Sequence, residues 1–125
     1  MNRKQLGQLG EAYAAQVLQE HGLHIMKRNW RCASGELDLV AKDGDVLVFV
    51  EVRTRSTAKA SNESAELRYG SVLEAVTWQK QQQVRRLAEI YLYQHRLHDQ
   101  PVRFDAVLVE KIGEQLKANY IQHAF

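Results

Sequence analysis

The chain has 125 residues, 45% of them hydrophobic and 26% charged, with a formal net charge of +2 and a sequence pI of about 8.8. This length fits one domain with its own hydrophobic core, and the composition is that of a folded protein rather than a disordered one. The longest wholly apolar run, Val46 to Val50, is too short to cross a bilayer, and the opening residues lack the apolar core of a signal peptide. We therefore expect a cytoplasmic protein with no membrane partner, and the mildly basic pI favours an anionic one.

The first half of the chain predicts a helix followed by three strands. Apolar residues at helical spacing predict an amphipathic helix from about 4 to 20, and a strand follows over 23 to 31. A hairpin comes next, with strands near 36 to 42 and 45 to 54. We place its turn at Asp43-Gly44, since a two-residue turn requires residues that tolerate positive φ angles.

A polar segment follows the hairpin. Residues 56 to 69 are rich in Ser, Glu and Ala and predict a mobile loop. Just beyond them, Ser71 and Glu74 have the spacing of a capping box, in which each side chain bonds the other residue's backbone N–H.

The last third of the chain predicts a long helix and two strands. Thr77 can cap a helix that runs to about His95, and strands are expected at 102 to 110 and near 117 to 122. The order α-β-β-β-α-β, with a further short strand, predicts a single α/β domain over residues 1 to 125. Its central mixed sheet should be flanked by helices.

Three carboxylates, Glu36, Asp38 and Glu51, interrupt the apolar hairpin outside its turn. A carboxylate in apolar surroundings is costly unless a cation lies beside it. With the turn at Asp43-Gly44, Glu36 lies opposite Glu51 and Asp38 is the diagonal neighbour of Glu51, so all three share a face with Arg53. A shared divalent cation would account for this arrangement. A hairpin face in water, or a salt bridge from Arg53, would account for it as well.

Two helical residues can reach the same place. Glu11 lies at the flank of the apolar stripe of the first helix, and Gly7 and Gly10 favour close packing of that helix against the sheet. In the later helix Lys80 extends the inward apolar stripe by one turn. The Lys80 side chain should therefore take one of two orientations. It points at an anion, either the acids or a phosphate, or it extends along the helix into solvent.

Basic residues are unevenly distributed along the chain. Lys and Arg outnumber Glu between Arg53 and Arg96, and residues 27 to 31 interleave Trp30 with cations, as nucleic-acid-binding surfaces often do. A solvated charged face is the alternative interpretation. The candidate nucleic-acid-binding residues are Lys27, Arg28, Arg31, Arg53, Arg55, Lys80, Arg85 and Arg86.

Several stretches resemble the YraN family of small bacterial proteins: GQLGEAYAAQVL, GELDLVAKDG, FVEVRTR, YGSVLEAVTWQKQQQVRRLAEIYL, VRFDAVLV and YIQHAF. The resemblance covers nearly the whole chain. That family is grouped with the PD-(D/E)XK nuclease fold and is similar to archaeal Holliday-junction resolvases. The resemblance implies an αβββαβ core and a role on nucleic acid, DNA above all, in repair or recombination. It is compatible with a homodimer, because the resolvases act as dimers.

The resemblance also implies site residues. Asp38 and Glu51 match the metal ligands of the nuclease motif, and Glu11 matches the acidic residue that resolvase-like members carry on the first helix. Mg²⁺ or Mn²⁺ is the expected cofactor, because Mg²⁺ is commonly held by one or two carboxylates and several waters. The Val52 carbonyl and Glu36 are further candidate ligands. The histidines show no coherent zinc-binding pattern.

The chain departs from the nuclease motif two residues after Glu51, where the motif has Lys and this chain has Arg53. Arginine keeps its proton at any relevant pH, so Arg53 is no general base, although it can bind phosphate or stabilise developing charge. Metal-bound water can ionise without a protein base, and Lys80 can supply an amine. Three functions stay open: a metal-dependent endonuclease on branched or exposed DNA, a nucleic-acid-binding module that cuts nothing, and a protein-interaction domain.

Overall fold

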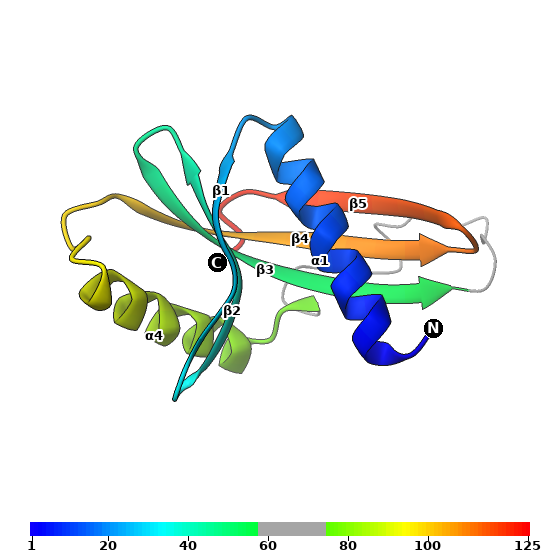
Figure 1. Cartoon of the computed structure of the whole chain (residues 1–125), viewed down its shortest axis with the longest axis horizontal. Coiled ribbons are helices and arrows are strands. Elements are labelled where there is room, and N and C mark those ends of the chain that lie inside the picture. Colours follow the sequence, from blue (N-terminus) through cyan, green and yellow to red (C-terminus); the bar gives the residue numbers. More distant parts are fainter. Residues whose placement is uncertain (58–74) are drawn as a thin grey trace.

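The computed structural model describes residues 1–57 and 75–125, in the order helix, three strands, helix, two strands (Figure 1). The elements are α1 Arg3–Glu20, β1 His24–Cys32, β2 Gly35–Asp43, β3 Val46–Thr57, α4 Trp78–Gln94, β4 Val102–Ile112 and β5 Gln115–Ile121. The α/β class is confirmed, and so is each predicted helix and strand to within a few residues. The predicted capping box at Ser71 and Glu74 lies outside the described residues.

The five strands form one mixed sheet in the order β1-β2-β3-β4-β5. All neighbours are antiparallel except β3 and β4, which run parallel, from Leu47 beside Val102 to Thr57 beside Ile112. Parallel neighbours need a long crossover connection, and α4 lies within it. Because β3 keeps its pairing with β4 to its last residue, Ser56 and Thr57 belong to the strand and not to the predicted loop. The rest of that loop, from residue 58, is outside the described part of the chain.

The turn between β2 and β3 is Gly44-Asp45, and the predicted turn at Asp43-Gly44 is wrong. Asp43 pairs with Val46, which leaves a two-residue loop. Gly44 has a φ of 59°, whereas Asp45 is outside the positive-φ region. This combination fits a type II′ turn, in which only the first central residue needs a positive φ.

The new turn changes the partners of the acidic residues. Extending the observed register, in which Leu39 pairs with Val50, places Asp38 directly opposite Glu51. The predicted arrangement, with Glu36 opposite Glu51 and Asp38 diagonal to it, is therefore wrong. The faces are unchanged, because a shift of two residues keeps every side chain on its own side of the sheet.

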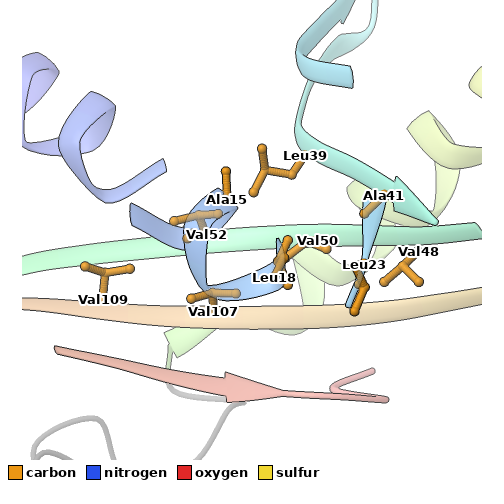
Figure 2. Packing of buried hydrophobic residues seen from close by; sticks show 11 residues of the cluster. Ala15, Leu18, Leu23, Leu39, Ala41, Val48, Val50, Val52, Val107 and Val109 are labelled. Carbon is orange, nitrogen blue, oxygen red and sulfur yellow. The ribbon is translucent and has the colours of Figure 1, made fainter. Parts of the chain in front are cut away.

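Each face of the sheet carries a hydrophobic core under one helix. Figure 2 shows the core beneath α1, where Ala15 and Leu18 pack on Val50 and other aliphatic side chains of the strands. On the other face, Leu87 of α4 packs against Phe49 in a core that includes aromatic rings. Side chains of β3 alternate between the two cores, which explains why its first half, residues 46–50, is apolar at every position.

Close contact between α1 and β3 centres on Gly10. A Cβ atom added there would collide with Thr54 Oγ1 and lie 2.8 Å from Thr54 Cβ. The predicted close packing is therefore confirmed for Gly10. It is wrong for Gly7, where an added Cβ would meet nothing within 4 Å.

Neither α1 nor α4 is long and apolar enough to cross a membrane, and no other helix in the described residues is either.

Candidate active site

The candidate site lies where β2 and β3 separate. Their pairing ends at Leu39 and Val50, and just beyond it the Asp38 carboxylate accepts a hydrogen bond from the Val52 N–H at 2.9 Å. The carboxylate thus takes the place of a strand partner. In a strand the N–H and C=O of one residue point to the same side, so the Val52 carbonyl also faces this edge. Beyond Val52 no described strand pairs with this edge of β3, which we call the open edge of β3.

Two carboxyl groups, Asp38 and Glu51, share this position with one ammonium group. The Glu51 side chain is 5% exposed, and Lys80 Nζ lies 3.8 Å from Glu51 Oε1. Of the two orientations that the sequence left open for Lys80, the structure shows the one that points at the acids. Lys80 is 27% exposed, so its charge remains partly in water and compensates the two carboxylates incompletely.

The raised pKa values of Asp38 and Glu51 reflect this shortage of positive charge. Burial, followed by the nearby charge of Asp38, raises the pKa of Glu51 to about 8, against the opposing influence of Lys80 and Arg53. Burial also raises the pKa of Asp38, although the hydrogen bond from Val52 N–H and the charge of Lys80 oppose the shift. An added cation would favour ionisation of both groups.

Glu11 approaches the pair from α1. Burial, followed by the charge of Asp38, raises the pKa of Glu11 to about 6, and a hydrogen bond from the Asn29 side chain opposes that shift. Across residues 1–57 and 75–125, no three acidic, His or Cys side chains gather closely enough to hold a metal ion by themselves. Glu11 therefore lies near the pair without forming a three-carboxylate metal site with it. Glu36 is paired with Arg31, whose Nε lies 3.4 Å from Glu36 Oε2, and the structure does not bring it into the pair as a third ligand.

Asn29 is a site residue that the sequence did not reveal. It has a φ of 51° within β1, between the pairs Arg28 with Leu39 and Trp30 with Leu37, so it lies across from Asp38. Its side chain forms the hydrogen bond that lowers the pKa of Glu11. The available signal was its residue type, because Asn is one of the few residues other than Gly that adopt positive φ readily.

A cleft of about 520 Å³ follows the open edge of β3 and reaches the site. Arg53 Nε, which borders it, is buried and has no hydrogen-bond partner among the described residues. Arg55 also borders it, and its Nε lies 3.7 Å from Glu110 Oε2. The residues that line the cleft are Arg3, Leu6, Gly7, Glu11, Val52, Arg53, Thr54, Arg55 and Ser56.

The other predicted nucleic-acid-binding residues lie around the site in different settings. Arg28 borders a small cavity of about 100 Å³ together with Glu11. Lys27 and Arg86 are exposed. Arg85 stacks its guanidinium on Phe104, 4.5 Å from the ring centroid, so aromatic contacts engage it.

Fold and site together define a small α/β protein that carries an acidic pair, one member of it buried, where two strands of the sheet separate. The model of the uncharacterised protein family UPF0102 matches residues 10–109, and the chain belongs to this family. It is the YraN family that the sequence resembles, so the expected membership is confirmed.

Relatives named UPF0102 protein match over nearly their full length. One from Dictyoglomus turgidum is 35% identical over 127 residues, which cover 100% of both chains. One from Stutzerimonas stutzeri is 42% identical over 120 residues, 95% of this chain and 92% of its own. A third, from Symbiobacterium thermophilum, is 44% identical over 123 residues, 98% of this chain and 97% of its own.

Proposed function

We propose that this protein is a divalent-metal-dependent endonuclease that hydrolyses DNA phosphodiesters, with branched DNA as the expected substrate. The observation that carries the proposal is the Asp38–Glu51 pair at the open edge of β3, in which Glu51 is buried and Asp38 half-buried, with less positive charge than two carboxylates need. Structural acids in a core are normally compensated by nearby cations or several hydrogen bonds. A pair left short of charge beside a cleft lined by arginines suits a site that receives a cation and a phosphate.

The donor atoms fit Mg²⁺ or Mn²⁺. Both ions favour hard oxygen ligands, and Mg²⁺ usually takes one or two carboxylates and keeps several waters. Asp38 and Glu51 would supply the carboxylates, and the Val52 carbonyl faces the same edge. When bound, the ion would neutralise charge on the phosphoryl oxygens and make its bound water a better nucleophile.

The chain's own residues would perform the remaining tasks. Arg53 would bind a non-bridging phosphate oxygen, because its guanidinium stays protonated and its buried Nε has no described partner. The Lys80 ammonium would stabilise the ionised form of Glu51 and orient a water molecule beside the two carboxylates. Glu11, held by Asn29, would accept a hydrogen bond from that water.

A second candidate function is a nucleic-acid-binding module that does not cut. The observation that favours it is Arg53 itself, which stands where the nuclease motif has a lysine and cannot act as a base. Such a module would use the same cleft and acids to hold a strand.

A cleavage assay separates these functions. Junction, flap and linear DNA are incubated with the protein in Mn²⁺, and we expect cleavage that Asp38→Asn and Glu51→Gln reduce by about 100-fold or more. Both substitutions keep the side-chain shape and remove a charge, so they should leave the fold intact. Glu89→Gln, at an exposed acid of α4, is the matched control and should cut like wild type.

Arg53→Lys tests the altered motif position and should cut at least as fast as wild type. If wild type and Arg53→Lys both leave every substrate intact while binding persists, the non-cutting module is the correct function. Loss of DNA and RNA binding even at low salt would contradict both functions and favour a protein-interaction domain.

A further inference from the structure

We propose that the cleft along the open edge of β3 binds the phosphodiester backbone of one nucleic-acid strand, and that Gly7 keeps the cleft open for it. The inference rests on the proposed action on nucleic acid and adds which form of it enters the site. Figure 1 shows the N-terminal part of α1 beside the C-terminal part of β3, and the cleft lies between these two segments.

The walls of the cleft carry an excess of positive charge. Arg3 lines it from α1, and Arg53 and Arg55 border it at the open edge of β3, where their side chains start from the sheet face opposite α1; Glu11 is the single acid of the lining. Arg55 shares its charge with Glu110, which is 1% exposed, whereas Arg53 Nε has no described partner. Guanidinium groups bind phosphate oxygens in a planar, two-pronged way, so this lining complements a chain of phosphates.

The strand edge adds backbone donors. The Val52 N–H already donates its hydrogen bond to the Asp38 carboxylate. Alternate residues of a strand direct their N–H groups to the same side, so Thr54 and Ser56 direct theirs to the open edge as well. No described strand pairs with them there. Backbone N–H groups commonly bind phosphate oxygens and fix the position of a nucleic acid without reading its bases.

The size of the cleft selects a single strand. A volume of about 520 Å³ is in the range of small-ligand sites and can hold one or two nucleotides. This volume leaves no room for a second, paired strand with its own backbone. The strand that reaches the acidic pair is therefore unpaired over these nucleotides, as at a flap, a gap or a branch point.

A nucleic-acid strand in the cleft would explain why residue 7 is a glycine. It lines the cleft, and an added Cβ would meet nothing within 4 Å, so no packing contact requires a glycine there. Glycine in a helix costs about 1 kcal/mol relative to alanine. A large side chain at this position would project into the cleft and take the place of a nucleotide.

Fluorescence anisotropy in EDTA tests the proposal without any cleavage. The probes are a labelled 12-nucleotide single strand, as DNA and as RNA, and a blunt DNA duplex of the same sequence. We expect Gly7→Phe to weaken single-strand binding by about 10-fold or more, while Gly7→Ala binds within about 2-fold of wild type. The strand that binds more tightly, DNA or RNA, is the type of nucleic acid that the cleft prefers. Tighter binding of either single strand than of the blunt duplex supports the proposal that the cleft binds one strand.

A charge-reversal pair checks the same cleft independently of whether Gly7→Phe folds. Arg3→Glu should weaken single-strand binding by about 10-fold and flatten its salt dependence. Lys4→Glu makes the same change of charge one residue along α1, outside the cleft lining, and should have a much smaller effect.

Three results would overturn the proposal. These are wild-type affinity in folded Gly7→Phe, equal losses in Arg3→Glu and Lys4→Glu, and tighter binding of the blunt duplex than of both single strands. Because these measurements contain no metal, their failure leaves the cleavage test of Asp38→Asn unaffected. Absence of cleavage likewise leaves the strand-binding result standing.

Discussion

Among single residues, Glu51 links the site most directly to the stability of the protein. The folded chain holds its proton up to a pKa of about 8, whereas the ordinary value is 4.5. Between these values the folded state binds more protons than the unfolded state, so the free energy of unfolding falls as the pH rises. Glu11, with a pKa of about 6, and Asp38, whose pKa is also raised, act in the same direction.

We therefore predict that the metal-free protein loses about 1–3 kcal/mol of its free energy of unfolding between pH 5 and pH 8. Urea denaturation in EDTA at several pH values measures this. Glu51→Gln should reduce the dependence, and Glu89→Gln should keep it. Millimolar Mn²⁺ at pH 8 should restore stability to wild type but not to Asp38→Asn. Stability that rises from pH 5 to pH 8 in EDTA would contradict the assigned acidities.

The part of the site that could be predicted from sequence is the set of residues that share one face. Alternation along the hairpin places Asp38 and Glu51 together, and helical spacing brings Lys80 toward them, because both rules depend only on local geometry. Asn29 could not be found in this way. Its role depends on a positive φ inside a strand, a local departure that no periodic pattern marks.

At the scale of elements, the two glycines of α1 have opposite roles. Gly10 lets the helix lie against Thr54, whereas Gly7 borders open space. Gly10→Ala should destabilise the protein by about 1–3 kcal/mol, because the helix must move away from β3. Gly7→Ala should stabilise it by about 1 kcal/mol through helix propensity. Thermal and urea denaturation of the two variants measure these effects, and changes of the same sign would contradict the packing of α1.

The hairpin register shows why elements are easier to predict than their alignment. The bounds of β2 and β3 follow from their apolar runs and the turn residues between them. Both Asp43-Gly44 and Gly44-Asp45 place Gly44 where a positive φ is needed, and the two registers put the same side chains on the same faces. The hydrophobic pattern therefore does not distinguish them. The choice decides whether Glu51 faces Glu36 or Asp38.

At the scale of the whole molecule, a buried polar network joins segments that are far apart in sequence. Asp105 is fully buried and accepts bonds from Arg103 Nε at 2.9 Å and from the Tyr120 hydroxyl at 2.6 Å. Arg103 also reaches Asp43 at the β2–β3 turn, and the His123 N–H donates to Asp105 at 3.0 Å. The network thus ties β4 to the hairpin turn and to the end of the chain. It was not foreseen, because charges at alternate positions of a strand also fit an exposed face.

Arg103→Met should lower the free energy of unfolding by roughly 3–5 kcal/mol, because it leaves the buried Asp105 charge without its cation. Adding Asp105→Leu to this variant should recover much of the loss, since a matched apolar pair can replace a buried ion pair. Urea denaturation of the single and double variants provides the comparison. A double variant no more stable than Arg103→Met would show that the bonds to Tyr120 and His123, rather than the charge, dominate.

The open edge of β3 also bears on how copies of the chain behave toward one another. An unpaired strand edge offers its N–H and C=O groups to any other strand, which makes it a route to aggregation. Here Arg53 and Arg55 stand on that edge, and Arg3 faces it across the cleft. Two such edges that approached each other would bring like charges together and repel. The arginines proposed to bind a polyanion would thus also disfavour the joining of two copies of the chain strand to strand.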